Sequence, residues 1–193
     1  MNEAALALLR DIPLSSESAL SFAFQRLRCR TFADAAELVW RLPYHRNVDA
    51  DVLAVLREER GTCSSKHALL ANLATDESVP MRLMLGIYYM TGMNTRGVGP
   101  VLVRHGLAGI PEAHCWLEVM GAPLDITRLL DGAQAAPVHF LRTELIRPEQ
   151  VGEYKRRFHQ DFLADWAGSA DAGGLTADGL WRVREECIAS LGS

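Results

Sequence analysis

One cysteine lies in a setting suited to nucleophilic chemistry. Cys63 follows Gly61-Thr62 and precedes Ser64-Ser65, and the run from Ala68 to Ala74 is apolar on nearly every side. Thr and Ser accept the orphan N–H groups at a helix start, and a helix that is apolar all round is a buried one. We therefore expect a buried central helix that begins at Cys63, where the helix dipole favours the thiolate. The alternative is a small core residue, the usual fate of a free cysteine.

A cysteine nucleophile needs a base to accept its proton and a third group to orient that base. His114 and Asp125 suit these roles, because they lie on two predicted strands joined by a tight turn and can be cross-strand neighbours. Strand alternation sets His114 and Trp116 on one face and Cys115 on the other, so Cys115 is not expected to share the site. The predicted catalytic residues are Cys63, His114 and Asp125.

The elements that must position these residues change from helices to strands after the cysteine. Residues 1–60 are expected to be helical. The expected helices are Asn2 to Leu9, one capped by Ser15 or Ser16, one opened by a Thr31–Asp34 capping box, and Asp49 to Glu59 with a Val48–Leu53 staple. Strands are expected at Met81–Met90, His114–Val119 and Pro123–Thr127, followed by helices from Pro148 to Trp166 and after Thr176. This order predicts an α+β fold, with the cysteine-bearing helix packed on an antiparallel sheet between extra N- and C-terminal helices.

The segment between the first two predicted strands, Thr91 to Ala113, is long for a compact domain. A short helix is expected within it, from Val98 to His105. A purely solvated loop would not need its apolar side chains, so we expect it to fold onto the core or a substrate. We predict a partly ordered lid over Cys63, and the alternative is an insertion packed far from the cleft. The apolar residues concerned are Val98, Val101, Leu102, Leu107 and Ile110.

Three blocks of sequence resemble the signature blocks of the transglutaminase-like superfamily. They are Gly61-Thr62-Cys63 at a helix start, His114-Cys115-Trp116-Leu117-Glu118, and Asp125-Ile126-Thr127. The stretch Val79-Pro80-Met81-Arg82 is similar to a further short segment of that family. The resemblance covers residues 41–128 and implies a papain-like core with a Cys63–His114–Asp125 triad acting on amides. It also implies one domain over residues 1–193, with a helical part at 1–60, a catalytic core at 61–128 and C-terminal helices at 148–193.

Further site residues follow from the chemistry of an oxyanion, which needs two donors. The Cys63 N–H is one, and the resemblance suggests a side chain upstream, for which Tyr44 and Asn47 are the candidates. Trp116 and His67 are further oxyanion or substrate candidates. Because His67 lies one turn after Cys63, these two residues could instead bind zinc together with His114 and Asp125. Nothing else enforces that site, so we expect a hydrogen-bonded His67 and no metal or cofactor.

Composition narrows the classes of function. The chain has 193 residues and a net charge of -4, with no basic stripe, so no nucleic-acid partner is expected. No run is long enough for a membrane span, and the N-terminus is unlike a signal peptide. Four scattered cysteines indicate free thiols in a reducing cytoplasm. We therefore expect a cytoplasmic cysteine hydrolase or acyltransferase for a peptide or small amide, of undefined oligomeric state. The alternative is a non-catalytic binding module of the same fold.

Overall fold

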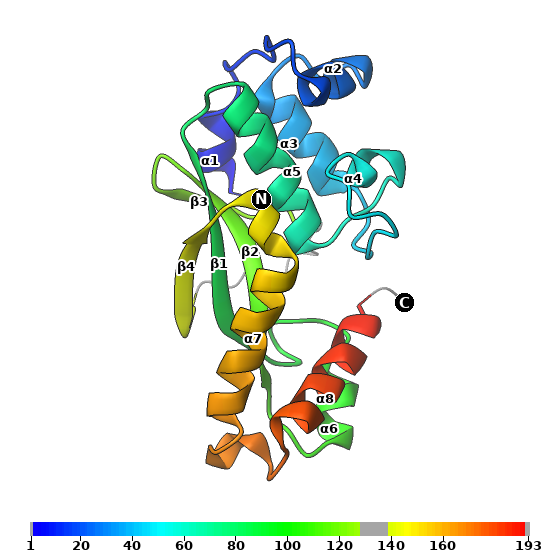
Figure 1. The fold of residues 1–193 in the computed structure, drawn as a ribbon, viewed down its shortest axis with the longest axis vertical. Coiled ribbons are helices and arrows are strands. Elements are labelled where there is room, and N and C mark those ends of the chain that lie inside the picture. Colours follow the sequence, from blue (N-terminus) through cyan, green and yellow to red (C-terminus); the bar gives the residue numbers. More distant parts are fainter. Residues whose placement is uncertain (1, 128–138, 192–193) are drawn as a thin grey trace. The chain divides into compact units, whose positions relative to one another are not determined.

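The computed structural model describes residues 2–127 and 139–191. Within them the chain forms eight α-helices, two short 3-10 helices and four strands (Figure 1). The strands form one antiparallel sheet in the order β3-β2-β1-β4, which confirms the predicted α+β class. None of the helices in these residues has the length and apolar character needed to cross a membrane.

The helices and strands have the following bounds. The helices are α1 (Glu3–Ala7), α2 (Ala19–Arg26), α3 (Phe32–Arg41), α4 (Ala54–Arg57), α5 (Cys63–Asp76), α6 (Gly99–Arg104), α7 (Glu153–Trp166) and α8 (Ala177–Ala189), with 3-10 helices η1 (Pro148–Val151) and η2 (Ala170–Ala172). The strands are β1 (Met81–Met90), β2 (Ile110–Val119), β3 (Ala122–Leu124) and β4 (Arg142–Ile146).

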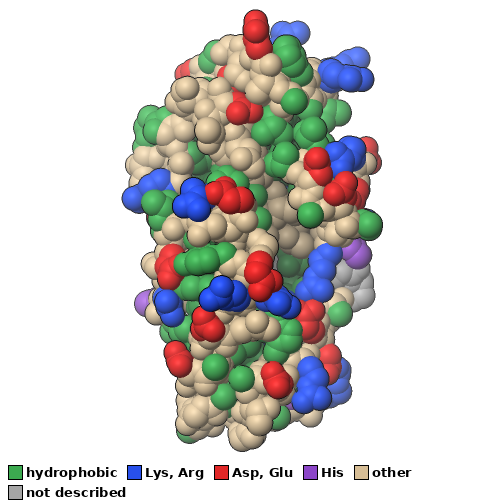
Figure 2. Space-filling view, viewed as in Figure 1, with side chains coloured by type: hydrophobic (Ala, Val, Ile, Leu, Met, Phe, Trp, Pro, Cys, Tyr) green, Lys and Arg blue, Asp and Glu red, His purple; other side chains and the backbone are tan. Residues whose placement is uncertain are grey.

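The chain divides into two compact units. Among the described residues, the first unit comprises 2–85, 115–127 and 145–151, and the second comprises 86–114, 139–144 and 152–191. Strands β1, β2 and β4 each contribute residues to both units. On the face that Figure 2 shows, basic and acidic side chains are interspersed, as the small net charge of -4 leads one to expect.

Helix α5 is the centre of the first unit and begins at Cys63, as predicted. Thr62 and Ser65 form a reciprocal capping box, in which each side-chain oxygen accepts the backbone N–H of the other residue. The helix contacts α2, α3, α4 and η1, and most of its side chains are buried. The prediction of a buried helix that starts at the cysteine is therefore confirmed.

The strands that carry the other predicted catalytic residues differ from the prediction at their ends. Strand β1 has the predicted bounds, whereas β2 begins at Ile110, four residues before His114. Strand β3 pairs with β2 across a two-residue turn, at which Met120 and Gly121 have φ of 49° and 83°. The pairing ends at Leu117↔Leu124, so Asp125 lies just beyond the paired residues.

The core of the second unit contains the apolar residues of the segment 91–113. Helix α6 is the short helix predicted there, and it packs against α8. All five apolar residues named above are buried together with Leu163 of α7 and Leu180 of α8. The expectation that they fold onto a core is confirmed. They therefore give no support to the predicted lid over Cys63, because a packed core residue is held in place.

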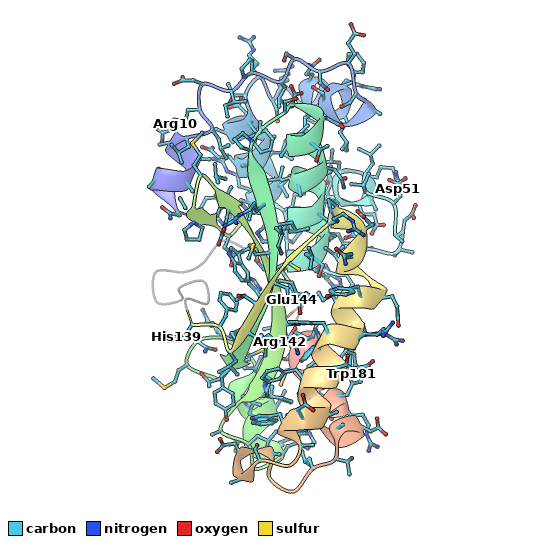
Figure 3. The ribbon with its side chains drawn as sticks, turned by 60° about the vertical axis from the view of Figure 1, so that its left-hand side comes forward. Arg10, Asp51, His139, Arg142, Glu144 and Trp181 are labelled. Carbon is cyan, nitrogen blue, oxygen red and sulfur yellow. The ribbon has the colours of Figure 1, made fainter. Side chains whose placement is uncertain are left out.

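Strand β4 is joined to α7 by side chains within the second unit. The guanidinium of Arg142 lies 4.8 Å from the centre of the Phe158 ring, and the Tyr154 hydroxyl donates to Glu144. Arg142 and Glu144 are labelled on the strand in Figure 3, and they also form an ion pair of 3.2 Å. These contacts fix the side-chain arrangement at this strand.

Two predicted helix starts of the first unit are wrong, and carboxylates explain both. Ser18 caps α2 in place of Ser15 or Ser16, because Glu77 accepts the N–H groups of Ser15 (2.9 Å) and Ser16 (3.1 Å). The Thr31–Asp34 capping box of α3 is present as predicted.

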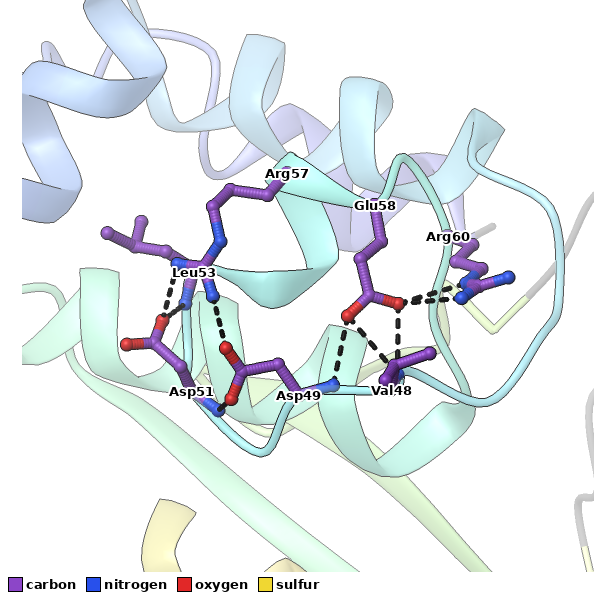
Figure 4. Close-up of polar contacts among 7 residues, drawn as sticks. All are labelled: Val48, Asp49, Asp51, Leu53, Arg57, Glu58 and Arg60. Carbon is purple, nitrogen blue, oxygen red and sulfur yellow. Dashed lines mark hydrogen bonds and ion pairs between the residues drawn. The ribbon is translucent and has the colours of Figure 1, made fainter.

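The other wrong start concerns the predicted helix from Asp49 to Glu59, which is reduced to α4. Glu58 accepts the N–H groups of Val48 and Asp49, both at 3.0 Å, and so holds the segment as a loop (Figure 4). Val48 is 88% exposed, so it forms no hydrophobic staple with Leu53.

Candidate functional site

Cys63 occupies a tightly packed helix start. It is the first residue of α5 and is 6% exposed. The backbone of Pro43–His45 runs beside Gly61, with the His45 N–H donating to the Gly61 carbonyl (3.1 Å) and the Gly61 N–H donating to Pro43 (3.2 Å). A Cβ at Gly61 would lie 2.9 Å from the Lys66 Cγ and from the Ser65 Oγ. Glycine is therefore the residue that lets the chain approach α5 this closely.

His67 joins the first turn of α5 to the segment after β3. The side chain is fully buried, and its Nε2 accepts the Ile126 N–H at 2.9 Å. Because a backbone N–H can only donate, Nε2 carries no proton, and Nδ1 therefore donates to the Cys63 carbonyl at 2.6 Å. The imidazole is neutral with both nitrogens in hydrogen bonds, as the sequence-based interpretation of a hydrogen-bonded His67 predicts. It offers no lone pair to zinc.

Asp125 lies beside His67 in the first unit. Its Oδ1 accepts the Thr127 N–H (2.9 Å) and the Thr127 hydroxyl (2.6 Å), and lies 3.6 Å from His67 Nε2. One more step of the β2–β3 register would set Asp125 opposite Trp116, two residues from His114 along β2. The pairing of Asp125 with His114 as cross-strand neighbours therefore stays a prediction.

Lys66 is a site residue that the sequence-based prediction missed. Its side chain is fully buried, and its Nζ donates to the carbonyls of Leu42 and Thr127, the latter at 2.9 Å. Burial lowers the pKa of Lys66 to about 8, although the negative charges of Asp125 and Cys63 act in the opposite direction. The signal in the sequence was a lysine within a helix predicted to be buried on all sides.

His114 and Trp116 are both buried on β2. His114 is the last residue of the 86–114 segment of the second unit, where it meets the Tyr88 ring edge-on at 5.9 Å and stacks on Phe140 at 6.5 Å. Trp116 belongs to the first unit, as do Cys63 and Asp125. The pairing of His114 with Cys63 stays a prediction.

The two upstream oxyanion candidates lie on the segment beside Gly61. Tyr44 forms an isolated parallel bridge with Gly61, two residues before the cysteine. Asn47 donates from Nδ2 to the Arg60 carbonyl at 3.0 Å, and its buried Oδ1 has no hydrogen-bond partner among the described residues. One Asn47 N–H is thus already bound to the loop, and the oxyanion role of both residues stays a prediction.

The contacts of His67 argue against the zinc alternative. Within residues 2–127 and 139–191, no group of three His, Cys, Asp or Glu side chains is placed to hold a metal ion. The zinc alternative needs His67 as a ligand, and the lone pair of its Nε2 is already bound to Ile126. What remains is a thiol at the positive end of a buried helix, in the same unit as a fixed carboxylate. Comparisons of the chain with family models, curated proteins and solved structures find no match.

Proposed function

We propose that this chain is a cysteine-dependent amide hydrolase or acyltransferase of the transglutaminase-like kind, with Cys63 as its nucleophile. The observation that carries the proposal is the position of Cys63 at the capped first residue of a buried helix. Asp125, the proposed orienting group, is fixed in the same unit by Thr127. A thiol at this place is biased toward the thiolate by the helix dipole.

The reaction proceeds through a thioester. His114 accepts the Cys63 proton, and the thiolate attacks the carbonyl carbon of a peptide or small amide to give a tetrahedral oxyanion. The backbone N–H of Cys63 is one donor to that oxyanion. Its collapse breaks the C–N bond, and His114 returns the proton to the leaving amine. Water then releases the acid, or a second amine captures the acyl group, and in either case the thiol is regenerated. Asp125 orients His114 throughout.

The proposal is tested with a library of fluorogenic peptide amides, with and without an added primary amine, followed by mass spectrometry. We expect turnover that is abolished in Cys63→Ala and His114→Ala, and reduced to a smaller extent in Asp125→Asn, whose residue orients and does not attack. Cys115→Ser is the matched control and should retain activity, because Cys115 is fully buried on the strand face opposite to His114.

Two outcomes contradict the proposal. One is turnover that persists in Cys63→Ala, which would place the chemistry elsewhere. The other is peptide binding without any acyl adduct on Cys63, which would favour the non-catalytic binding module. Circular dichroism of each variant separates loss of chemistry from loss of fold.

A further inference from the structure

Lys66 is a buried cation whose direct hydrogen-bond partners are uncharged. Its Nζ donates to the carbonyls of Leu42 and Thr127, and the side chain is fully buried. Transfer of an ammonium group out of water costs several kcal/mol unless nearby negative charge compensates it. Carbonyl oxygens satisfy the N–H donors but carry no net charge. A compensating charge must therefore act on Lys66 from somewhere other than these two acceptors.

The geometry of α5 identifies where that charge lies. Lys66 stands three residues after Cys63, and residues at this spacing are neighbours on a helix surface, with Cβ atoms about 5–6 Å apart. On its other side, Lys66 binds the carbonyl of Thr127, whose N–H and hydroxyl bind the Asp125 carboxylate. The thiol and the carboxylate of the proposed site are thus the two groups whose negative charge acts on the ammonium group.

We propose that Lys66 is a positioning residue whose fixed positive charge holds the Cys63 thiol as the thiolate. This inference rests on the proposed function only in taking Cys63 as the nucleophile. Lys66 does not touch the substrate or move a proton; it acts through the charge of Cys63.

The other titratable groups around Lys66 are consistent with this role. The negative charges acting on Lys66 are those of Asp125 and Cys63, and the neighbouring His67 is neutral. Burial lowers the pKa of Lys66 to about 8, so the ammonium form still predominates at about neutral pH. Coupling between two groups is reciprocal: if Lys66 favours the thiolate, the thiolate favours the ammonium by the same factor.

The test is the pH titration of the Cys63 thiolate, followed by ultraviolet absorbance and corrected with Cys63→Ala. In Lys66→Met we expect about a tenfold or greater loss of thiolate at a fixed pH below the midpoint, as removal of an adjacent opposite charge predicts. Lys66→Arg should restore the wild-type titration. The matched control is Lys155→Met, which removes a buried lysine of the second unit and should leave the titration unchanged. An unchanged midpoint in folded Lys66→Met overturns the inference.

If Lys66→Met does not fold, the inference is tested on the wild-type chain by measuring the effect of Cys63 on the titration of Lys66. Lys66 is followed by the chemical shift of its Cε, before and after iodoacetamide has converted Cys63 to a neutral thioether. The Lys66 titration midpoint should fall after alkylation, and an unmoved midpoint overturns the inference.

Amide turnover, measured separately, distinguishes the two proposals. A Lys66-dependent thiolate without turnover supports the role of Lys66 and contradicts the enzyme. Cys63-dependent turnover with a Lys66-independent thiolate supports the enzyme and contradicts the role of Lys66.

Discussion

At the scale of single residues, the second unit buries a bidentate ion pair between Arg184 and Glu112. Arg184 donates from Nε and Nη2 to the two carboxylate oxygens of Glu112, at 2.7 and 2.6 Å. Their side chains are only 11% and 6% exposed. Burial, the largest influence, raises the pKa of Glu112, but the positive charges of Arg184, His159 and Lys155 together outweigh it, so the pKa is held below its ordinary value. The pair is therefore charged at neutral pH.

We predict that Glu112→Gln destabilises the chain by about 3–5 kcal/mol, because the buried Arg184 loses its bidentate partner and keeps only the more exposed Glu185. Urea unfolding measures this free energy. Glu186→Gln is the matched control, since Glu186 pairs with Arg104 at an exposed position and should change the stability far less.

The pH dependence of this stabilisation has a definite sign. A carboxyl whose pKa is lowered on folding stabilises the native state above its ordinary pKa of 4.5, and that contribution is lost as the pH falls through the lower folded value. Wild-type stability should therefore fall in acid more steeply than that of Glu112→Gln. Equal acid sensitivity of the two chains would contradict this account.

His67 gives a second prediction at this scale, which concerns its tautomer. The Ile126 N–H bond requires an unprotonated Nε2, so nitrogen NMR at about neutral pH should show a proton on Nδ1 alone. His67→Gln should weaken the attachment of the 125–127 segment to α5 and accelerate hydrogen exchange at the Ile126 amide. A proton found on Nε2 would be incompatible with the described contact.

At the scale of elements, the loop before Cys63 is held by one carboxylate. The N–H groups of Val48 and Asp49, followed by Arg60, lower the pKa of Glu58 to about 2 (Figure 4). The Glu58 carboxylate should therefore hold the loop in place fully above pH 4.5. Its contribution should be lost only as the pH falls through about 2.

We predict that the amide proton shifts of Val48 and Asp49 titrate with a midpoint of about 2, the folded-state value for Glu58. In Glu58→Gln the titration should disappear, and exchange at both amides should accelerate because a neutral amide is a weaker acceptor. Glu59→Gln, a change at the exposed next residue, is the control and should leave both amides unaffected. A midpoint near 4.5 in the wild type would show that the contact is absent in solution.

The elements also show which features could be predicted from sequence. The Thr31–Asp34 capping box and the bounds of β1 were correct, because their signals lie within a few residues of one another. Side-chain acceptors outside any local motif decided which helix starts were missed, and some of these acceptors lie far away in the sequence. Ser15 and Ser16, the residues expected to cap a helix, are held by Glu77, more than 60 residues away, which accepts their backbone N–H groups. Within the candidate site, the helix start at Cys63 could be predicted because its capping residues, Thr62 and Ser65, lie next to it in the sequence. The role of Lys66 depends on carbonyls at Leu42 and Thr127, which no sequence motif marks.

At the scale of the whole molecule, the four cysteines should differ widely in reactivity. All four are free and buried, as expected of a chain without disulfides. Burial raises the pKa of Cys29 and of Cys187 to about 11, so neither forms much thiolate near neutral pH. Cys63 has the setting that favours a thiolate, at the start of α5.

We predict that iodoacetamide modifies Cys63 well before the other three cysteines at mildly acidic pH. Peptide mapping by mass spectrometry after timed quenching gives the four rates. Serine at Cys29 or Cys187 should leave the Cys63 rate unchanged, provided that the variant folds. Equal and slow modification of all four would argue against an activated thiol.

The contacts of Lys66 have a consequence for the nascent chain. Its two acceptors lie 24 residues before it and 61 residues after it in the sequence. A ribosome adds these 61 residues in about 3–12 s. During that interval the ammonium group can reach only the Leu42 carbonyl, and burying it would cost free energy that the finished chain does not lose. We therefore expect the apolar side chains of α5 to stay accessible to chaperones until Thr127 has emerged.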